Sequence, residues 1–241
     1  MKFLEGGVCA PKGFLASGIH CGIRRNKQKK DLSLIYSEKK AVAAAVYTRN
    51  LVKGAPIFVT QKNLEAPYAS AIICNSGNAN TCNANGREIA ERMCALTAEE
   101  LGILPSDIII ASTGVIGQPL DINPIKDGLP AVVGGLSENG SDSAAEGIMT
   151  TDTVKKEVAV SFSAGGKLCT VGGIAKGSGM IHPNMATMLV FLTTDIAISP
   201  ALLQKALSED TENSFNMISI DGDTSTNDMA CILANGMAGN D

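Results

Sequence analysis

Short apolar runs alternate along the chain with loops rich in glycine and asparagine, and this pattern limits the fold to a mixture of strands and helices. Two such runs, Ile72-Ile73-Cys74 and Ile108-Ile109-Ile110, each lead directly into a loop. Between them, apolar residues recur at helical spacing over residues 89–101. Residues 154–162 and 167–174 alternate around a glycine turn, as a hairpin does. We therefore predict an α/β chain whose strands are mixed and in part antiparallel.

The remaining elements follow from the same patterns. We expect strands over 14–23, 32–36, 41–47, 56–60 and 187–191, and helices over 128–136 and from Pro200 onward. A basic run, residues 24–30 (RRNKQKK), joins the first two of these strands. We interpret this run as a solvated hairpin tip in preference to an anion site, because adjacent like charges are most favourable in water.

The core of such a fold has to be built from small aliphatic side chains at close approach. The 241 residues include no Trp, three Tyr and six Phe, but 25 Gly. Hydrophobic residues make up 45% and charged residues 18%, which excludes an intrinsically disordered chain. The net charge of −4 argues against general nucleic-acid binding, which depends on Lys and Arg contacts to phosphates. No apolar stretch approaches the ~18 residues that a membrane helix requires, so we expect neither nucleic acid nor a membrane as a partner.

The cysteines and histidines favour free thiols and no metal site. Seven Cys are present without a Cys-x-x-Cys pair, and the only histidines are His20 and His182. Zinc sites usually contain close ligand pairs, whereas free thiols persist in a reducing cytosol. The first residues also lack the apolar segment of a signal peptide. We therefore predict a cytoplasmic protein without a bound metal.

The most informative stretch runs from Lys176 to Asp195. A glycine-rich loop, Pro183 and the small residue Ala186 lead directly to Thr187, which begins an apolar run. A self-cleaving N-terminal nucleophile needs this arrangement, because its hydroxyl has to reach the preceding carbonyl. Once freed, the α-amino group titrates near pH ~8 and can act as the base for its own hydroxyl. From spacing alone, however, a Thr that begins a strand is far more often structural than catalytic.

The same stretch closely resembles the cleavage-site signature of the ornithine acetyltransferases, the bifunctional glutamate N-acetyltransferase/amino-acid acetyltransferases of arginine biosynthesis. The resemblance extends over the whole chain, because four further segments look like segments of that family in the same order. These segments are residues 75–85, 111–117, 149–153 and 221–228. Several matched segments in one order are more specific than any single motif.

The resemblance implies a site, residue by residue. Members of this family are made as precursors that cut themselves between Ala and Thr, here Ala186 and Thr187. Thr187 would then be the nucleophile that takes acetyl from N-acetylornithine and passes it to glutamate through an acetyl-enzyme. The other matching positions are Thr113 and Gly114 for the oxyanion hole, and Thr150 and Lys176, together with Thr187, for substrate binding.

Without the resemblance, Thr150 would be an ordinary turn residue and Lys176 a solvated cation, because most Thr and Lys side chains are exposed. His182 invites a general-base role, but we interpret it as structural, since cleavage would leave it near the end of the other fragment. The chemistry implies neither a metal nor an organic cofactor. Acetyl-CoA enters only as an additional acetyl donor for glutamate, and the sequence leaves its use open.

The resemblance also implies an αββα-type fold, in which a sandwich of two sheets lies between helix layers, as in the ornithine acetyltransferases and related aminopeptidases. Residues 1–241 would form most of the first domain, with 1–186 as the α fragment and 187–241 as the start of the β fragment. The family pattern continues beyond position 241, so we expect a C-terminally truncated chain that lacks the C-terminal domain. Two α and two β fragments would associate as a heterotetramer.

Two other classes of function stay open at this point. An N-terminal-nucleophile amidase or aminopeptidase of related fold would share the chemistry of Thr187 but pass the acyl group to water. A non-catalytic metabolite-binding module is the second class, and it applies if the precursor is never cut.

Overall fold

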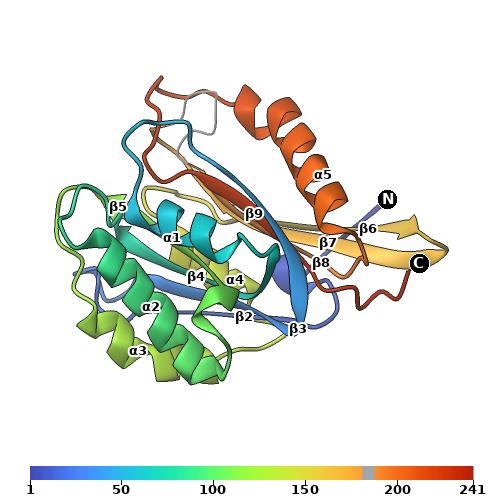
Figure 1. Ribbon diagram of the computed structural model, residues 1–241, viewed down its shortest axis with the longest axis horizontal. Helices are drawn as coiled ribbons and strands as arrows, with labels where there is room; N and C mark the ends of the chain where they lie inside the picture. Colours follow the sequence, from blue (N-terminus) through green and yellow to red (C-terminus); the bar gives the residue numbers. More distant parts are fainter. Residues whose placement is uncertain (181–187, 241) are drawn as a thin grey trace.

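The computed structural model describes residues 1–180 and 188–240, which form nine strands, five α-helices and three short 3₁₀ helices (Figure 1). The strands are β1 (Lys2–Leu4), β2 (Phe14–Ile19), β3 (Leu32–Tyr47), β4 (Tyr68–Asn78), β5 (Ile108–Val115), β6 (Lys156–Ala164), β7 (Lys167–Lys176), β8 (Leu189–Thr194) and β9 (Met229–Ala234). The helices are α1 (Ala55–Asn63), α2 (Gly86–Leu101), α3 (Asn123–Gly134), α4 (Ser141–Ile148), α5 (Pro200–Asn213), η1 (Gly7–Cys9), η2 (Pro105–Asp107) and η3 (Phe215–Met217). None of these described helices is long and apolar enough to cross a membrane.

The long strand β3 joins two layers of strands. Its first half pairs with β2 along one edge and with β4 along the other. The register with β4 shifts between Tyr36 and Ala41, and the second half of β3 then pairs with β9 on the edge that β2 has left. One layer is therefore made of β2, β3, β4 and β5, and the other of β1, β6, β7, β8, β9 and the end of β3.

Three apolar clusters lie between these layers and the helices. The middle cluster contains Ile35 and Ile72 from the first layer together with Phe191 and Leu233 from the second. A second cluster lies between β3–β5 and the helices α2 and α3, and a third lies between β8, β9 and α5. The order is helix, sheet, sheet, helix, with α2 and α3 on one side and α5 on the other (Figure 1). This confirms the predicted α/β class with mixed strands, and pairing through β3 joins both layers into one sheet.

The structure corrects the prediction of a strand over 56–60. These residues lie in α1, which has Pro56 in its first turn. Proline suits the first turn because its missing N–H would have no helical partner there in any case. Thr60 then fixes the helix against β5: its Oγ1 donates to the Ile110 carbonyl at 2.8 Å and accepts from the Ile110 amide at 2.9 Å. A tertiary contact therefore overrides the strand preference of this β-branched run.

The helix α4 approaches β2 so closely that only glycine fits between them. A Cβ atom on Gly18 would lie 1.9 Å from the carbonyl oxygen of Ser143. Near the end of the helix, the Ser76 hydroxyl of β4 donates a 2.6 Å hydrogen bond to the carbonyl of Gly147. These contacts set the position of residues 149–152, which follow α4 directly.

The substitution Gly18→Ala tests this close approach. The added methyl group has to displace the backbone of α4, so we expect the free energy of unfolding to fall by about 1–3 kcal/mol. Gly134→Ala is the matched control, since nothing lies within 4 Å of a Cβ at that position. The control should unfold at the wild-type urea concentration or slightly above it. Equal urea midpoints for the two variants would contradict the proposed contact.

Candidate active site

The site begins where the parallel strands β4 and β5 end. Gly77 of β4 and Gly114 of β5 are register partners, and the register shifts immediately after them. Gly114 has a φ of +132°, and a Cβ there would lie 2.3 Å from the carbonyl carbon of Gly77. Both the angle and the distance exclude a side chain at this position. Thr113, the residue before Gly114, is 7% exposed at the end of the same strand.

Lys176 reaches the same place from the other layer. It is the last residue of β7 and only 2% exposed. Its Nζ donates a 3.3 Å hydrogen bond to Oγ1 of Thr113, and the carboxylates of Asp152 and Asp228 act on it electrostatically. Burial lowers the pKa of this amine, because the charged form loses its water, while the nearby carboxylate of Asp152 opposes the shift.

Asp152 ties together the two segments that carry the predicted substrate-binding residues. Its carboxylate accepts hydrogen bonds from the Thr150 amide at 3.2 Å and from the Gly177 amide at 2.8 Å. The Lys156 ammonium adds a third at 2.6 Å. Burial alone would raise the pKa of Asp152, but these three donors outweigh it and hold the pKa below its ordinary value. Asp152 therefore fixes the turn at Thr150 against the end of β7.

These strand ends and turns surround a pocket of about 440 Å³. It is lined by Arg24, Gly77, Ala79, Thr113, Gly114, Val115, Ile116, Thr150, Thr151, Lys176, Gly179, Met180, Ser225, Thr226 and Asn227. The four predicted site residues that the structure describes, Thr113, Gly114, Thr150 and Lys176, all belong to this lining. They come from β5, from β7 and from the turn after α4, so the fold brings together residues that are far apart in sequence.

The predicted cleavage pair, Ala186 and Thr187, lies outside the described residues. On one side of that segment, Met180 lines the pocket. On the other side, the Met188 amide donates a 2.9 Å hydrogen bond to the carboxylate of Asp228, which directly follows the lining residue Asn227. The described chain therefore leaves and resumes beside the same pocket.

Sequence reasoning missed Asn227, whose side chain holds the loop before β9 against the ends of β4 and β5. Its amide group donates to the carbonyls of Ala79 and Ser112 at 2.7 and 2.9 Å. Its Oδ1 accepts from the hydroxyls of Thr81 and Thr226, each at 2.6 Å. Asn227 belongs to one of the segments of the family resemblance, but no local pattern distinguishes it from an ordinary turn residue.

Arg24 is the second residue that sequence reasoning missed. We interpreted the basic run 24–30 as a solvated hairpin tip, and Arg25 and most of its neighbours are indeed exposed. Arg24 is half-buried instead, and it lines the pocket. The sequence of a basic run does not indicate which of its residues is buried, because burial depends on the contacts of each side chain with other strands.

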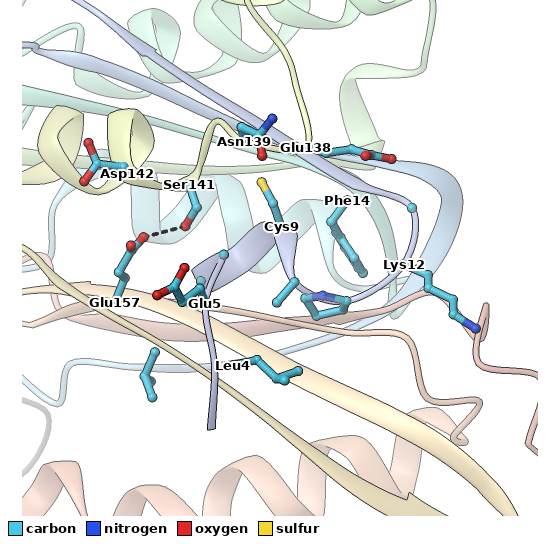
Figure 2. A pocket seen from close by; sticks show the side chains of 16 residues that line it. Leu4, Glu5, Cys9, Lys12, Phe14, Glu138, Asn139, Ser141, Asp142 and Glu157 are labelled. Atoms are coloured by element: carbon cyan, nitrogen blue, oxygen red, sulfur yellow. Dashed lines mark hydrogen bonds between the residues drawn. The ribbon is translucent and has the colours of Figure 1, made fainter. Parts of the chain in front are cut away.

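A larger hollow of about 790 Å³ lies between η1, α4 and β6 (Figure 2). Its lining includes Glu157, which accepts a 2.8 Å hydrogen bond from the Ser141 hydroxyl, and the thiol of Cys9. Burial raises the pKa of Cys9 to about 11, so this thiol stays protonated and is a poor nucleophile at neutral pH. No cluster in the described ranges could hold a metal ion. The smaller pocket therefore carries the candidate chemistry.

Replacing Asp152 tests its role in holding this site. Asp152→Asn places an NH2 group against backbone donors, so we expect the free energy of unfolding at pH 7 to fall by about 1–3 kcal/mol. Because the pKa of Asp152 is lowered by folding, its stabilisation is fully present above the ordinary Asp value of about 3.9 and is lost as the pH falls through the lowered value. Urea unfolding of both proteins at pH 7 and near pH 3 measures the difference, which should shrink in acid. A constant difference would mean that the carboxylate charge is irrelevant.

Comparison with known proteins identifies the family. The model of the ArgJ family matches residues 15–241. The arginine biosynthesis bifunctional protein ArgJ of Symbiobacterium thermophilum is 52% identical over 242 residues, which cover 100% of this chain and 60% of that protein. The chain therefore spans about 60% of the length of such curated relatives.

Solved structures agree with this assignment. The arginine biosynthesis bifunctional protein argJ of Bacillus halodurans matches with a TM-score of 0.72 and 43% identity, covering 77% of this chain and 97% of its own. The ornithine acetyltransferase of Mycobacterium tuberculosis, crystallised with ornithine, matches with a TM-score of 0.68 and 35% identity, covering 76% and 97%. An L-aminopeptidase D-Ala-esterase/amidase from Ochrobactrum anthropi covers 95% of this chain and 74% of its own with a TM-score of 0.56, but at 11% identity it shows the fold alone. This chain belongs to the ArgJ family.

Proposed function

We propose that the chain is part of a self-processing acetyltransferase of arginine biosynthesis, which moves acetyl from N-acetylornithine to glutamate through an acetyl-Thr187 intermediate. The observation that carries this proposal is the meeting of Thr113, Gly114, Thr150 and Lys176 at one pocket. The names of the relatives support it, because they are bifunctional proteins of arginine biosynthesis and one is an ornithine acetyltransferase complexed with ornithine.

The first half of the proposed reaction transfers acetyl to the enzyme. The Thr187 hydroxyl oxygen attacks the carbonyl carbon of the N-acetyl group, and the hydroxyl proton passes to the α-amino group of Thr187. The C–N bond then breaks, and ornithine leaves with that proton. In the second half, the amino group of glutamate attacks the carbonyl carbon of the acetyl ester, and a proton of that amine passes through the α-amino group of Thr187 to its side-chain oxygen. The C–O bond of the ester then breaks, which gives N-acetylglutamate and restores the Thr187 hydroxyl. The two half-reactions balance without an oxidant or reductant.

Both half-reactions pass through an oxyanion, for which Thr113 and Gly114 are the proposed donors. Oγ1 of Thr113 accepts its hydrogen bond from Lys176, so its own proton is free to be donated. The Gly114 N–H belongs to a backbone that is fixed by the close approach of β4 and β5. Donors that are fixed before the reaction stabilise the transition state most, and losing one typically costs about 3 kcal/mol.

Lys176 and Thr150 are proposed to bind the substrate together with Thr187. Burial of an ammonium group is costly, so direct contact with a carboxylate of a bound amino acid would stabilise Lys176. Thr150 is held beside it through Asp152, which accepts hydrogen bonds from the Thr150 and Gly177 amides. The two proposed binding residues thus share one carboxylate anchor.

The proposal includes no metal and no organic cofactor. Acyl transfer needs a nucleophile, a base and charge stabilisation for the oxyanion, and residues of the chain can supply all three. Acetyl-CoA is the additional donor that would acetylate glutamate directly in a bifunctional enzyme. We further propose a cytoplasmic heterotetramer of two α and two β fragments.

The lengths of the crystallised relatives support cleavage between Ala186 and Thr187. The Bacillus halodurans structure covers 77% of these 241 residues, about 186 residues, while 97% of its own chain is matched. Its chain is therefore close in length to the proposed α fragment, although the curated relatives are longer than the chain described here. The Mycobacterium tuberculosis structure has nearly the same coverage.

A transfer assay on the complete protein tests the proposed function. N-acetylornithine and glutamate should give equal amounts of ornithine and N-acetylglutamate with ping-pong kinetics, measured by mass spectrometry. Release of acetate without N-acetylglutamate would identify an amidase instead, and binding without turnover would identify a metabolite-binding module. A parallel incubation with acetyl-CoA and glutamate alone decides whether acetyl-CoA is a donor.

Self-cleavage is tested with two substitutions of one residue. Thr187→Ala removes the attacking hydroxyl, so the protein should stay uncut and show no acetyl transfer. Thr187→Ser keeps a hydroxyl and should still be cut, which makes it the matched control. Intact mass measurement after purification distinguishes the uncut chain from an N-terminal fragment that ends at Ala186. Efficient cutting of Thr187→Ala would remove Thr187 from the mechanism.

A further inference from the structure

Arg24 is held at the pocket by its own backbone and by a glycine. Its amide donates a 2.9 Å hydrogen bond to Asp31, a fully buried carboxylate that also accepts from the amides of Cys21 and Gly22. A Cβ atom on Gly77 would lie 2.9 Å from Cγ of Arg24, so the stem of the side chain crosses the end of β4 where only glycine leaves room. The direction of this side chain is therefore fixed by the fold.

The guanidinium group of Arg24 has donors that the protein does not use. Nη2 donates to the carbonyl of Met149, the residue before Thr150. Nε is buried and has no hydrogen-bond partner among the described residues, and the salt bridges found in them do not include Arg24. Burial lowers the pKa of the group, but an Arg side chain stays charged at neutral pH. Arg24 is thus a cation at the pocket that Asp31 and Asp152 attract from beyond salt-bridge distance, and its side chain donates to one neutral oxygen among the described residues.

In the described part of the chain, the charged residues that line the pocket are all basic. These two basic residues are Arg24 and Lys176, and no Asp or Glu occurs among the described residues that line the pocket. The two cations come from different parts of the fold, one after β2 and the other at the end of β7. A ligand with one carboxylate can neutralise only one of them.

The two substrates of the proposed function differ in this respect. N-acetylornithine carries one carboxylate and a side-chain ammonium, which a second cation would repel. Glutamate and N-acetylglutamate each carry two carboxylates. A guanidinium binds a carboxylate with two parallel hydrogen bonds in favourable cases, and such charge-assisted bonds are stronger than neutral ones.

We propose that Arg24 is a specificity-determining residue that binds the side-chain carboxylate of the acceptor, a dicarboxylic amino acid, while Lys176 binds the α-carboxylate that both substrates share. This inference rests on the proposed function and deepens it. It explains how one pocket accepts a neutral donor and then favours an acidic acceptor over amino acids of similar size.

The test compares Arg24→Gln with wild type in the complete protein. We expect the KM for glutamate to rise about tenfold or more, because a charge-assisted contact is lost. The KM for N-acetylornithine should not rise, since the contact to Lys176 is kept and the cation that repels the ammonium of this substrate is removed. The preference for glutamate over glutamine as acceptor should fall by a similar factor, and Arg24→Lys should restore part of it.

Arg25→Gln is the matched control, because it removes the same charge from the exposed neighbour and should leave both KM values unchanged. Urea unfolding of each variant checks that the fold is retained. Equal rises of both KM values, or an unchanged preference for glutamate over glutamine, would overturn the inference and leave Arg24 as a support for Met149. Wild-type protein that transfers no acetyl would overturn the proposed function, and this inference with it.

Discussion

The bent strand β3 is the feature on which the candidate site depends. Its register shift between Tyr36 and Ala41 lets one hydrogen-bonded ladder continue from the first layer of strands into the second. The carboxyl end of β5 and the carboxyl end of β7 belong to different layers, yet Thr113 and Lys176 approach to 3.3 Å. Two separate sheets could slide relative to each other, whereas a strand that is hydrogen-bonded into both layers restricts that movement.

The acidic and basic residues of this site differ in how many hydrogen bonds they form with the rest of the protein. The buried carboxylate of Asp152 receives three hydrogen bonds from the chain itself and needs nothing from a ligand. Among the described residues, the two cations of the pocket donate hydrogen bonds to neutral oxygens of Thr113 and Met149, and Asp152 attracts both of them from beyond salt-bridge distance. Burial of a charge is unfavourable, so a bound anion in direct contact with these cations would recover part of that cost.

Local patterns predicted the elements whose causes are local. The hairpin of β6 and β7 and the helix over 89–101 follow from alternation and helical spacing, and both are present. The prediction of a strand over 56–60 was wrong because its β-branched residues suit a strand, whereas the contact between Thr60 and Ile110 stabilises the helix. The interpretation of Arg24 as a solvated residue was wrong for the same reason, since its burial depends on a contact with Gly77 in another strand. The meeting of Thr113 with Lys176 was accessible only through resemblance, because no periodicity relates residues 63 positions apart.

The backbone positions one group of the site, the Gly114 amide, whereas long side chains position the charged groups of Arg24 and Lys176. The amide of Gly114 is positioned by a strand pair whose close approach and positive φ exclude any other residue. Arg24 and Lys176 reach the same pocket on long side chains, whose length and charge can change without moving β4 or β5. If the amide serves as the oxyanion donor, acyl-transfer chemistry is a property of the fold, and the choice of acyl acceptor is a property of the side chains around it. Substitutions of Arg24 should therefore alter specificity before they alter the chemical step, whereas substitutions of Lys176 also remove the hydrogen bond to Thr113.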